Sequence, residues 1–210
     1  VKQLADEGKL GANTFFVTGA QCPPVPGVIQ PDKFASCGNL PGTLVDLIKR
    51  ENIQSVVLGA GWGGYQENGM LIERQGQRLP LNTKDGVEAF YANLEDYVRL
   101  LQAHGARVYL ILGHPVHHRF DPAQMVTRSV TGFQIDPNAG NGIPIVELQA
   151  PWVIINARLR AVSENTGATL LDPFPDICGL SNSCLPFFGA AEPKYTDFTH
   201  LRPVFVREHV

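Results

Sequence analysis

The sequence predicts an α/β domain built around a parallel β-sheet. Short apolar runs typical of buried strands alternate along the chain with longer segments whose apolar residues recur at helical spacing. Such alternation of strands and helices forms a parallel sheet with helices on both faces. We therefore expect a three-layer αβα sandwich, and the length of 210 residues fits a single domain over 1–210.

Each expected element rests on a local pattern. Strands are expected at 13–18, 53–58, 107–112 and 168–172, where short runs rich in β-branched, aromatic or leucine residues end at glycine or aspartate. Helices are expected at 43–51, 84–104 and 150–166, with the end of another at 1–9. The polar stretch 66–83 predicts a surface hairpin, and 114–148 is a long irregular region of a kind that is usually functional.

The loops that follow the strands should meet at one edge of the sheet. Glycines follow Thr18, Leu58 and Leu112, and the C-terminal tail follows the last strand. Ligands of such sheets bind outside the carboxyl ends of the strands, which is the edge that these loops share. We therefore expect the functional site at that edge.

Composition argues against several classes of partner. The net charge of −3 gives no reason to expect nucleic acid or an anionic membrane face as a partner. No apolar run is long enough to span a bilayer.

The first residues lack the apolar core of a signal peptide and resemble the middle of a helix, so we expect the chain to begin inside a longer protein.

The four cysteines form two pairs that are close in sequence, Cys22 with Cys37 and Cys178 with Cys184. Each pair lies in a loop rich in Pro, Gly or Ser, and neither has the spacing of a zinc site. We expect two local disulfides and, with them, an oxidising compartment such as the periplasm or the cell surface. Four unpaired thiols in a cytosolic α/β enzyme are the alternative.

The C-terminal tail places Asp197 and His200 three residues apart, just before a short helical pattern. The Asp could orient the imidazole and stabilise its charged form, while the His takes a proton from a nucleophile. The structural alternative is a surface turn whose Asp caps the following helix. The catalytic interpretation requires a serine on a strand-to-helix turn, and no serine of the chain is predicted to lie on one.

Two other features of the sequence have plainer interpretations. His114, His117 and His118 follow one strand, but the adjacent His117 and His118 would point in different directions unless the backbone turns sharply, so we expect a loop lining the cleft rather than a metal site. The glycine-rich run 59–64 fits neither of the common phosphate-binding patterns, so we expect no nucleotide site.

Four motifs, in this order, make the chain resemble the SGNH (GDSL-like) hydrolase superfamily. They are Cys22-Pro23-Pro24, the run from Val56 to Trp62, the pair Cys178 and Cys184, and Tyr195-x-Asp197-x-x-His200-Leu201. More narrowly, the chain resembles the extracytoplasmic SGNH domain fused to membrane-bound acyltransferases of the acyltransferase-three family. Those proteins O-acylate surface polysaccharides or peptidoglycan.

The resemblance implies roles for individual residues. His200 would be the general base of a Ser-His-Asp triad, with Asp197 as its orienting partner. Gly19 is the candidate for one backbone donor of the oxyanion hole. Gly61 stands where the family often has Asn, and Trp62 after it would shape an acyl or sugar pocket or be a plain core aromatic. The resemblance implies no metal and no other cofactor.

The resemblance also implies a function and its setting. We expect an O-acyltransferase or esterase that transfers or removes an acyl group, for which we expect acetyl, on hydroxyls of cell-surface carbohydrate. Its partners would be a carbohydrate acceptor, an acyl donor and a membrane-embedded acyltransferase domain in the same polypeptide, at the periplasmic or extracytoplasmic face of a membrane. A noncatalytic polysaccharide-binding module of such a protein is the alternative.

The chain departs from the family at the nucleophile, because no Gly-Asp-Ser occurs. In the flavodoxin-like SGNH fold the serine ends the first strand, which is central in the strand order 2-1-3-4-5. Without that strand, the expected strands at 13–18 and 53–58 would flank a lane of unpaired backbone groups. We therefore expect an N-terminally incomplete domain whose serine-bearing strand precedes residue 1.

Overall fold

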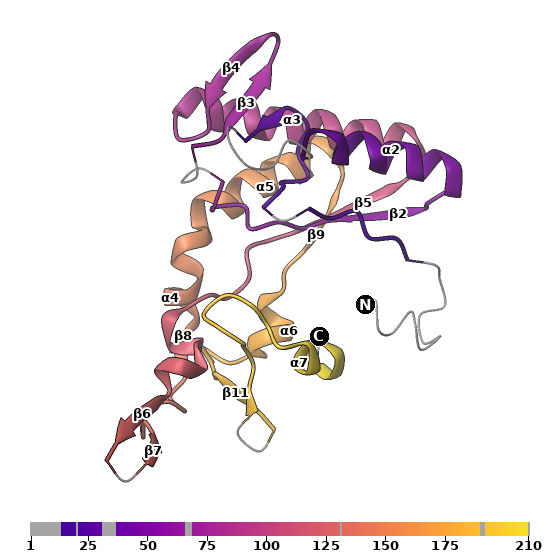
Figure 1. Cartoon of the computed structure of the whole chain (residues 1–210). Helices are drawn as coiled ribbons and strands as arrows, with labels where there is room; N and C mark the ends of the chain where they lie inside the picture. The colour runs from indigo at the N-terminus through magenta and orange to yellow at the C-terminus, as the bar shows by residue number, and fades with distance from the viewer. Residues whose placement is uncertain are drawn as a thin grey trace. The chain divides into compact units, whose positions relative to one another are not determined.

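The computed structural model describes residues 14–19, 21–30, 37–65, 69–130, 132–189 and 192–209 (Figure 1). The helix end expected at 1–9 lies outside these ranges. The chain divides into two compact units. Phe15–Gly113 and Ile154–Asp172 make up what we call the sheet unit, and His114–Val153 with Pro173–Val210 make up the tail unit. Their union in one domain stays a prediction.

The sheet unit is built on three parallel strands, as the sequence predicts. They are β2 (Ser55–Leu58), β5 (Arg107–Ile111) and β9 (Thr169–Leu171), in the order β2-β5-β9. Val57 lies beside Tyr109, which in turn lies beside Thr169, so the three strands end at the same edge. The α/β class with a parallel sheet is confirmed.

Three long helices accompany these strands. They are α2 (Leu40–Glu51), α3 (Lys84–Ala103) and α5 (Val153–Thr166), close to the expected ranges. The hydroxyl of Thr83 accepts a hydrogen bond from Gly86 N and so caps the start of α3. Asn52 closes α2 in the left-handed region, with φ of 50°. Local capping signals therefore set the helix ends near where the sequence places them.

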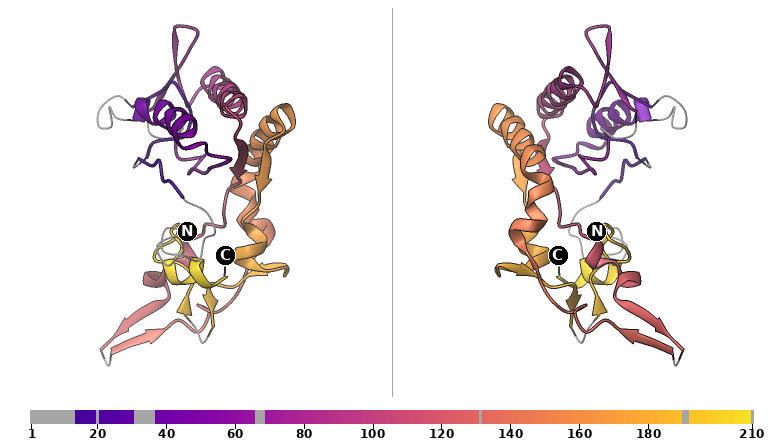
Figure 2. Two further views of the ribbon diagram at one scale, coloured as in Figure 1. Left: turned by 90° about the vertical axis from the view of Figure 1, so that its right-hand side faces the viewer. Right: turned by 90° about the vertical axis from the view of Figure 1, so that its left-hand side faces the viewer.

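The helices cover one face of the sheet. Val56, Leu58, Val108 and Leu110 all point to that face and join one buried core with residues of α2, α3 and α5. Figures 1 and 2 show these helices on the same side of the strands. Side chains of the other face are more open within this unit, since Val57 is 55% exposed.

The strand expected at 13–18 is wrong for the part that the structure describes, because residues 14–19 have no regular secondary structure. The sequence run has β character, but a strand also requires a partner for its backbone groups. On its outer edge, β2 pairs with no described strand. In the order 2-1-3-4-5, the run 14–18 would be the second strand and would pair with the first. No described strand occupies the position of that first strand.

The hairpin expected within 66–83 is confirmed. Strands β3 (Leu71–Arg74) and β4 (Gln77–Pro80) are antiparallel, and β1 (Val28–Ile29) adds to β3. Gln75 and Gly76 form the connection with φ of 52° and 77°, as a type I′ turn requires. This small sheet packs against α3.

The tail unit holds short elements where the sequence suggests an irregular region. They are β6 (Val126–Ser129), β7 (Gly132–Ile135), β8 (Ile143–Pro144), α4 (Ile145–Gln149), α6 (Phe174–Cys178), β10 (Ser183–Cys184), β11 (Phe187–Phe188), β12 (Glu192–Pro193) and α7 (Pro203–His209). The strands pair antiparallel as β6 with β7, β8 with β10, and β11 with β12. The short helix expected after the Asp-His pair is α7.

Both expected disulfides are present. Cys22 is bonded to Cys37 over a sequence separation of 15, and Cys178 to Cys184 over a separation of 6. No cysteine is left as a free thiol, so the structure does not support the alternative of four unpaired thiols. Gly19 lies so close to the first bridge that a Cβ there would stand 2.7 Å from the Cys22 sulfur.

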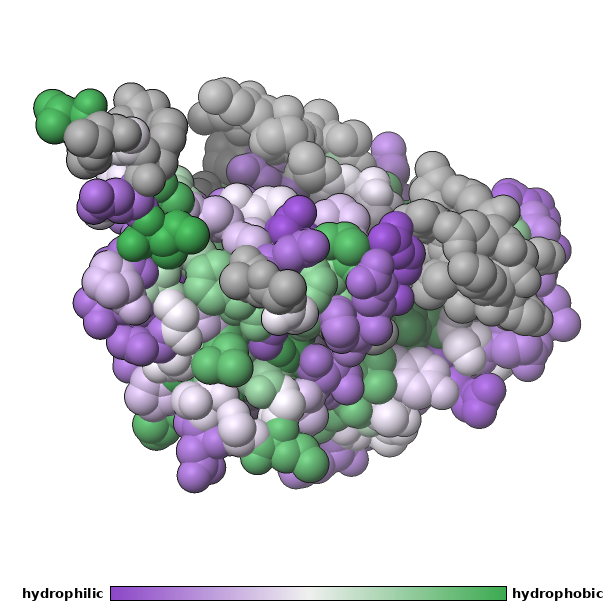
Figure 3. Space-filling view, turned by 90° about the horizontal axis from the view of Figure 1, so that it is seen from below, coloured by the Kyte–Doolittle hydropathy of each residue, from purple (hydrophilic) through white to green (hydrophobic). Residues whose placement is uncertain are grey.

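The described surface is mixed in character. Figure 3 shows apolar side chains interspersed among polar ones on the face that it draws. Within the ranges given above, no helix combines the length and the apolar content that a bilayer crossing needs.

Candidate active site

Asp197 and His200 lie in a tight loop that closes on itself within the tail unit. An antiparallel bridge joins Tyr195 to Leu201 at its base. Inside that bridge, Thr196 N donates to the carbonyl of His200 over 2.8 Å, and the Thr196 hydroxyl donates to the same oxygen over 3.0 Å. The loop backbone is therefore held by its own hydrogen bonds, with Asp197 and His200 at its tip.

Tyr195 anchors the base of the loop. Its side chain is fully buried, and its hydroxyl donates to the carbonyl of Pro115 over 2.6 Å. The Tyr195 ring stacks on Phe120 with centroids 4.6 Å apart and planes inclined by 3°. The start of the loop is thus fixed to the segment that follows β5.

Lys194, the residue before it, is a buried cation. Its Nζ donates to the carbonyl of Ile177 over 2.7 Å and lies 5.4 Å from the centroid of the Phe205 ring. Burial lowers the pKa of Lys194 because the charged amine loses water. The side chain links the loop to α6 and α7.

One oxygen of Asp197 organises the turn. Oδ1 accepts hydrogen bonds from Thr199 N over 2.7 Å, from His200 N over 2.8 Å and from the Thr199 hydroxyl over 3.0 Å. A carboxylate that accepts from backbone N–H groups two and three residues ahead is a capping arrangement. These contacts cap the turn itself rather than the following helix that the sequence alternative named, because α7 begins only at Pro203.

The other oxygen of Asp197 faces the imidazole. Oδ2 lies 2.7 Å from Nδ1 of His200. A carboxylate can only accept at this distance, so Nδ1 carries the proton and the lone pair of a neutral ring lies on Nε2. The His200 side chain is 78% exposed, and no described residue makes a hydrogen bond to Nε2. The arrangement leaves a base with its reactive nitrogen open to solvent.

The hydrogen bonds keep Asp197 ionised. The backbone N–H of Thr199, then the backbone N–H and the ring of His200, lower the pKa of Asp197 well below its usual range. A carboxylate with so low a pKa does not take the proton from the imidazole; it orients the ring and stabilises the imidazolium that forms. His200 can therefore act as a general base, and the negative charge of Asp197 balances the positive charge that the imidazole gains with the proton.

No nucleophile faces this base within the described residues of the tail unit. The hydroxyl of Ser181 donates to the carbonyl of Ser183, and neither serine contacts His200. The hydroxyl of Thr199 lies 3.1 Å from His200 Nδ1, on the side of the ring away from Nε2. Acyl transfer by the dyad would therefore need a hydroxyl from elsewhere.

Gly19, Gly61 and Trp62 belong to the sheet unit, where Gly61 and Trp62 follow the carboxyl end of β2. Trp62 is 1% exposed, and its Nε1 donates to the carbonyl of Ile111 over 2.8 Å. A Cβ at Gly61 would meet no atom within 4 Å. Whether these residues share a site with Asp197 and His200 stays a prediction, since the two units are described separately.

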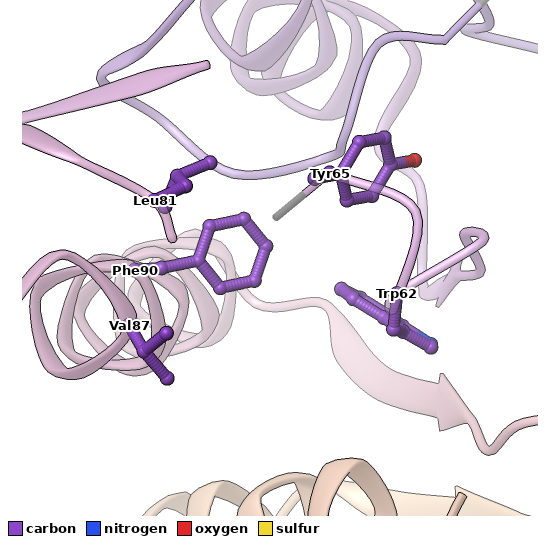
Figure 4. A pocket seen from close by; sticks show the side chains of 5 residues that line it. All are labelled: Trp62, Tyr65, Leu81, Val87 and Phe90. Atoms are coloured by element: carbon purple, nitrogen blue, oxygen red, sulfur yellow. The ribbon is translucent and has the colours of Figure 1, made fainter. Parts of the chain in front are cut away.

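Trp62 also lines a small apolar cavity of the sheet unit. Its neighbours there are Tyr65, Leu81, Val87 and Phe90 (Figure 4). The indole nitrogen is already bonded to the backbone, so this wall of the cavity offers a ring face rather than a donor. The structure thus gives Trp62 the packing of a core aromatic.

The three histidines after β5 make different contacts, and the ring centroids of His117 and His118 lie 4.2 Å apart. His117 Nε2 lies 3.1 Å from Glu147, and its Nδ1 accepts from Arg119 N. Burial is the largest cause of the lowered pKa of His117. His114 Nε2 lies 2.9 Å from the carbonyl of Thr199, in the loop of the dyad. Among the described residues no cluster of metal-ligand side chains occurs.

His114 is a residue near the dyad whose contact the sequence did not reveal. Its place after a strand suggested only a loop lining a cleft. Nothing in the spacing of His114 and Thr199, which are 85 residues apart, indicates the bond between them.

Comparison with known proteins assigns the chain to a family. The periplasmic domain of a lipopolysaccharide acetyltransferase from Salmonella ser. Paratyphi A is a similar solved structure, with a TM-score of 0.50 and 14% sequence identity. The match covers 86% of this chain and 62% of that one, and at this identity it shows the fold alone. No curated protein matches. The family model described as "SGNH domain (fused to AT3 domains)" matches residues 2–208, and the chain therefore belongs to that family.

Proposed function

We propose that this domain transfers or removes an acyl group, for which acetyl is the first candidate, on hydroxyls of cell-surface carbohydrate. The observation that carries the proposal is the dyad, in which Asp197 holds Nδ1 of His200 at 2.7 Å while Nε2 stays open. Membership of the SGNH family supports an acyl-related activity in general terms.

The dyad would act twice in one catalytic cycle. His200 Nε2 takes the proton of a serine hydroxyl as the serine oxygen attacks the acyl carbonyl, and the proton then goes to the departing oxygen of the donor. The acyl-serine is next attacked by a sugar hydroxyl or by water, whose proton passes to Nε2 and on to the serine oxygen. Asp197 stays ionised throughout and balances the imidazolium charge. No metal or other cofactor enters this sequence.

We propose that the serine lies on a strand that pairs with the outer edge of β2. That edge has no described partner. Unpaired strand edges are costly when buried and are normally covered or paired. The strand β2 corresponds to the third strand of the family order 2-1-3-4-5. The position beside it in the sheet therefore belongs to the family's first strand.

The proposed oxyanion site would use backbone donors near that strand. Gly19 and Gly61 remain the candidates, with Trp62 beside them as a wall of the acyl or sugar pocket. The open space around a Cβ at Gly61 means that packing does not explain the glycine there. Close approach of a substrate to the backbone would explain it.

We place the domain at the periplasmic or extracytoplasmic face of a membrane, in the same polypeptide as a membrane-embedded acyltransferase domain. The family description names fusion to AT3 domains, and the similar solved structure is a periplasmic domain. Two disulfides favour an oxidising compartment. An acyl donor and a carbohydrate acceptor would be its substrates.

The test is the replacement His200→Ala in the full-length protein, with acetyl turnover measured on an activated acetyl ester and on the native polysaccharide. We expect turnover to fall by a factor on the order of 10³ or more, as for loss of the base from a serine triad. His104→Ala is the matched control, because His104 is an exposed histidine at the end of α3. Unchanged turnover in His200→Ala would refute the proposal.

A noncatalytic polysaccharide-binding module is the second candidate. The observation that favours it is the absence of a described tail-unit serine near His200 Nε2. It predicts that His200→Ala leaves acyl turnover by the whole protein intact, while substitutions that weaken polysaccharide binding lower it. Measurement of polysaccharide binding and turnover on the same variants separates the two functions.

A further inference from the structure

The segment just after β5 holds the dyad loop by three hydrogen bonds. His114 Nε2 lies 2.9 Å from the carbonyl of Thr199, and His117 N donates to the carbonyl of Phe198 over 3.2 Å. In the opposite direction, the carbonyl of Pro115 accepts the Tyr195 hydroxyl. Of the side chains in this segment, His114 makes the contact nearest to His200.

The bond from His114 has a definite direction. A backbone carbonyl can only accept, so the proton must be on Nε2 of His114 in this contact. The imidazole is a donor at Nε2 in one neutral tautomer and in the charged form, so the bond does not require the ring to be charged.

The carbonyl that His114 holds belongs to the peptide group whose N–H is that of His200. The same N–H donates to Oδ1 of Asp197 over 2.8 Å. This one peptide plane is therefore fixed at both ends, by His114 at its oxygen and by Asp197 at its nitrogen. Because a peptide group is planar, the two bonds together fix the position of the His200 Cα, from which the side chain leaves the backbone.

We propose that His114 is a positioning residue for the base His200. It touches no reacting atom in this assignment, and it acts by holding the Thr199–His200 peptide so that the imidazole keeps its bond to Asp197. This inference rests on the proposed function for its catalytic meaning, but the geometry it asserts can be measured without turnover.

The surroundings of His114 suit this role. The His114 side chain is partly buried, and its ring lies 6.2 Å from that of Trp152, inclined by 31°. Trp152 is itself 9% exposed, so the histidine is held against a buried ring. A ring fixed in this way loses little entropy when its nitrogen holds the loop.

Two variants of His114 separate the hydrogen bond from the packing. His114→Phe keeps a ring against Trp152 but has no donor. His114→Gln loses the ring but keeps an N–H donor at a similar reach. His118→Phe is the matched control, since the His118 ring packs on His117 and makes no described contact with the loop.

The experiment compares kcat, KM and the Nδ1–H proton resonance of His200 in the full-length protein. In His114→Phe we expect kcat to fall about 10²-fold with KM nearly unchanged, the cost of a misplacement near 1 Å. The His200 Nδ1–H resonance should shift or broaden while the melting temperature stays close to that of the parent protein. His114→Gln should recover most of kcat, and His118→Phe should match the parent.

The experiment can refute the role of His114 and the proposed function independently of each other. If His200→Ala is inactive while His114→Phe keeps kcat and an unshifted His200 resonance, His114 is not a positioning residue. A loss in His114→Phe that follows a lower melting temperature and is not restored by Gln also overturns the inference. If His200→Ala keeps full turnover, the proposed function fails, and the resonance alone then decides the role of His114.

Discussion

Oδ2 of Asp197 lies 2.7 Å from Nδ1 of His200, while Oδ1 of the same carboxylate holds the turn that carries the imidazole. The sequence left two roles for this Asp as alternatives, a cap for the helix that follows its turn and the orienting member of a triad. In the structure the carboxylate caps the turn with one oxygen and contacts the imidazole with the other, so a capping contact does not exclude the orienting role. A substitution at this position must therefore be judged by its effect on each oxygen.

Asp197→Asn is predicted to preserve the turn and lose the base. The amide oxygen can still accept from Thr199 N and His200 N, but the NH₂ group then faces Nδ1 of His200. A donor there favours the tautomer with the proton on Nε2, so the base has no lone pair to offer. We expect kcat to fall on the order of 10³–10⁴-fold, measured as acetyl turnover by the full-length protein.

Asp136→Asn is the matched control for this change. Oδ1 of Asp136 accepts from Asn138 N over 2.8 Å in an exposed turn of the same unit. The substitution makes the same chemical change in a similar turn without a histidine partner. Equal activity of the two variants would contradict the orienting role of Asp197.

Asp197 is predicted to stay ionised in the pH range in which an ordinary aspartate takes up its proton. Its pKa is lowered by the hydrogen bonds described above, so their contribution to stability is fully present above the pKa of an unfolded Asp, about 3.9. That contribution is lost only as the pH falls through the lower pKa of the folded state. We expect the carboxyl ¹³C resonance of Asp197 to change little between about pH 5 and about pH 3.

The assignment of that resonance has its own check. The Asp197 carboxyl signal is the one that disappears in Asp197→Asn. If it moves with a midpoint near pH 4, the hydrogen bonds to Thr199 and His200 do not hold in solution.

Most of the sheet unit could be predicted from local sequence. The strands that became β2, β5 and β9, the hairpin within 66–83 and the Cys22–Cys37 disulfide follow from apolar runs, turn residues and cysteine spacing, as does the Cys178–Cys184 disulfide of the tail unit. The prediction of a strand at 13–18 was wrong because a strand also needs a neighbouring strand to pair with, and no local pattern encodes that neighbour. In the tail unit, the pairing of β8 with β10 is non-local in the same way.

The candidate site was predictable only in part. The spacing of Asp197 and His200 indicated the dyad because a loop bond between residues three apart is local. The contacts of His114 with Thr199 and of Tyr195 with Pro115 join residues 85 and 80 positions apart, so only the folded chain reveals them. Positioning residues of this kind carry no signature in a single sequence.

Tyr195→Phe and Tyr97→Phe form a matched pair of predictions. Each tyrosine is buried and donates its hydroxyl to a proline carbonyl, Tyr195 to Pro115 over 2.6 Å and Tyr97 to Pro41 over 2.9 Å. Each substitution leaves a carbonyl without its donor, at a cost of about 1–3 kcal/mol in the free energy of unfolding. We expect denaturant unfolding to show a similar loss for both.

The two variants should differ in activity. Tyr195 anchors the dyad loop two residues before Asp197, whereas Tyr97 lies on α3 in the sheet unit. We expect a lower kcat for Tyr195→Phe and an unchanged kcat for Tyr97→Phe. Equal activity of the two variants would mean that the Tyr195 hydroxyl stabilises the tail unit without fixing the loop.

Trp62→Phe decides between the two roles considered for that residue. The indole is buried, and its Nε1 donates to the carbonyl of Ile111 in β5, so the turn after β2 is tied to the neighbouring strand. Phenylalanine removes this bond and leaves unfilled volume, which together cost about 2–4 kcal/mol in the free energy of unfolding. If Trp62 is a core aromatic, this loss should come with an unchanged KM for the acetyl ester and for the polysaccharide. A higher KM at unchanged stability would instead assign Trp62 to the substrate pocket, because a wall of that pocket contributes to binding rather than to folding.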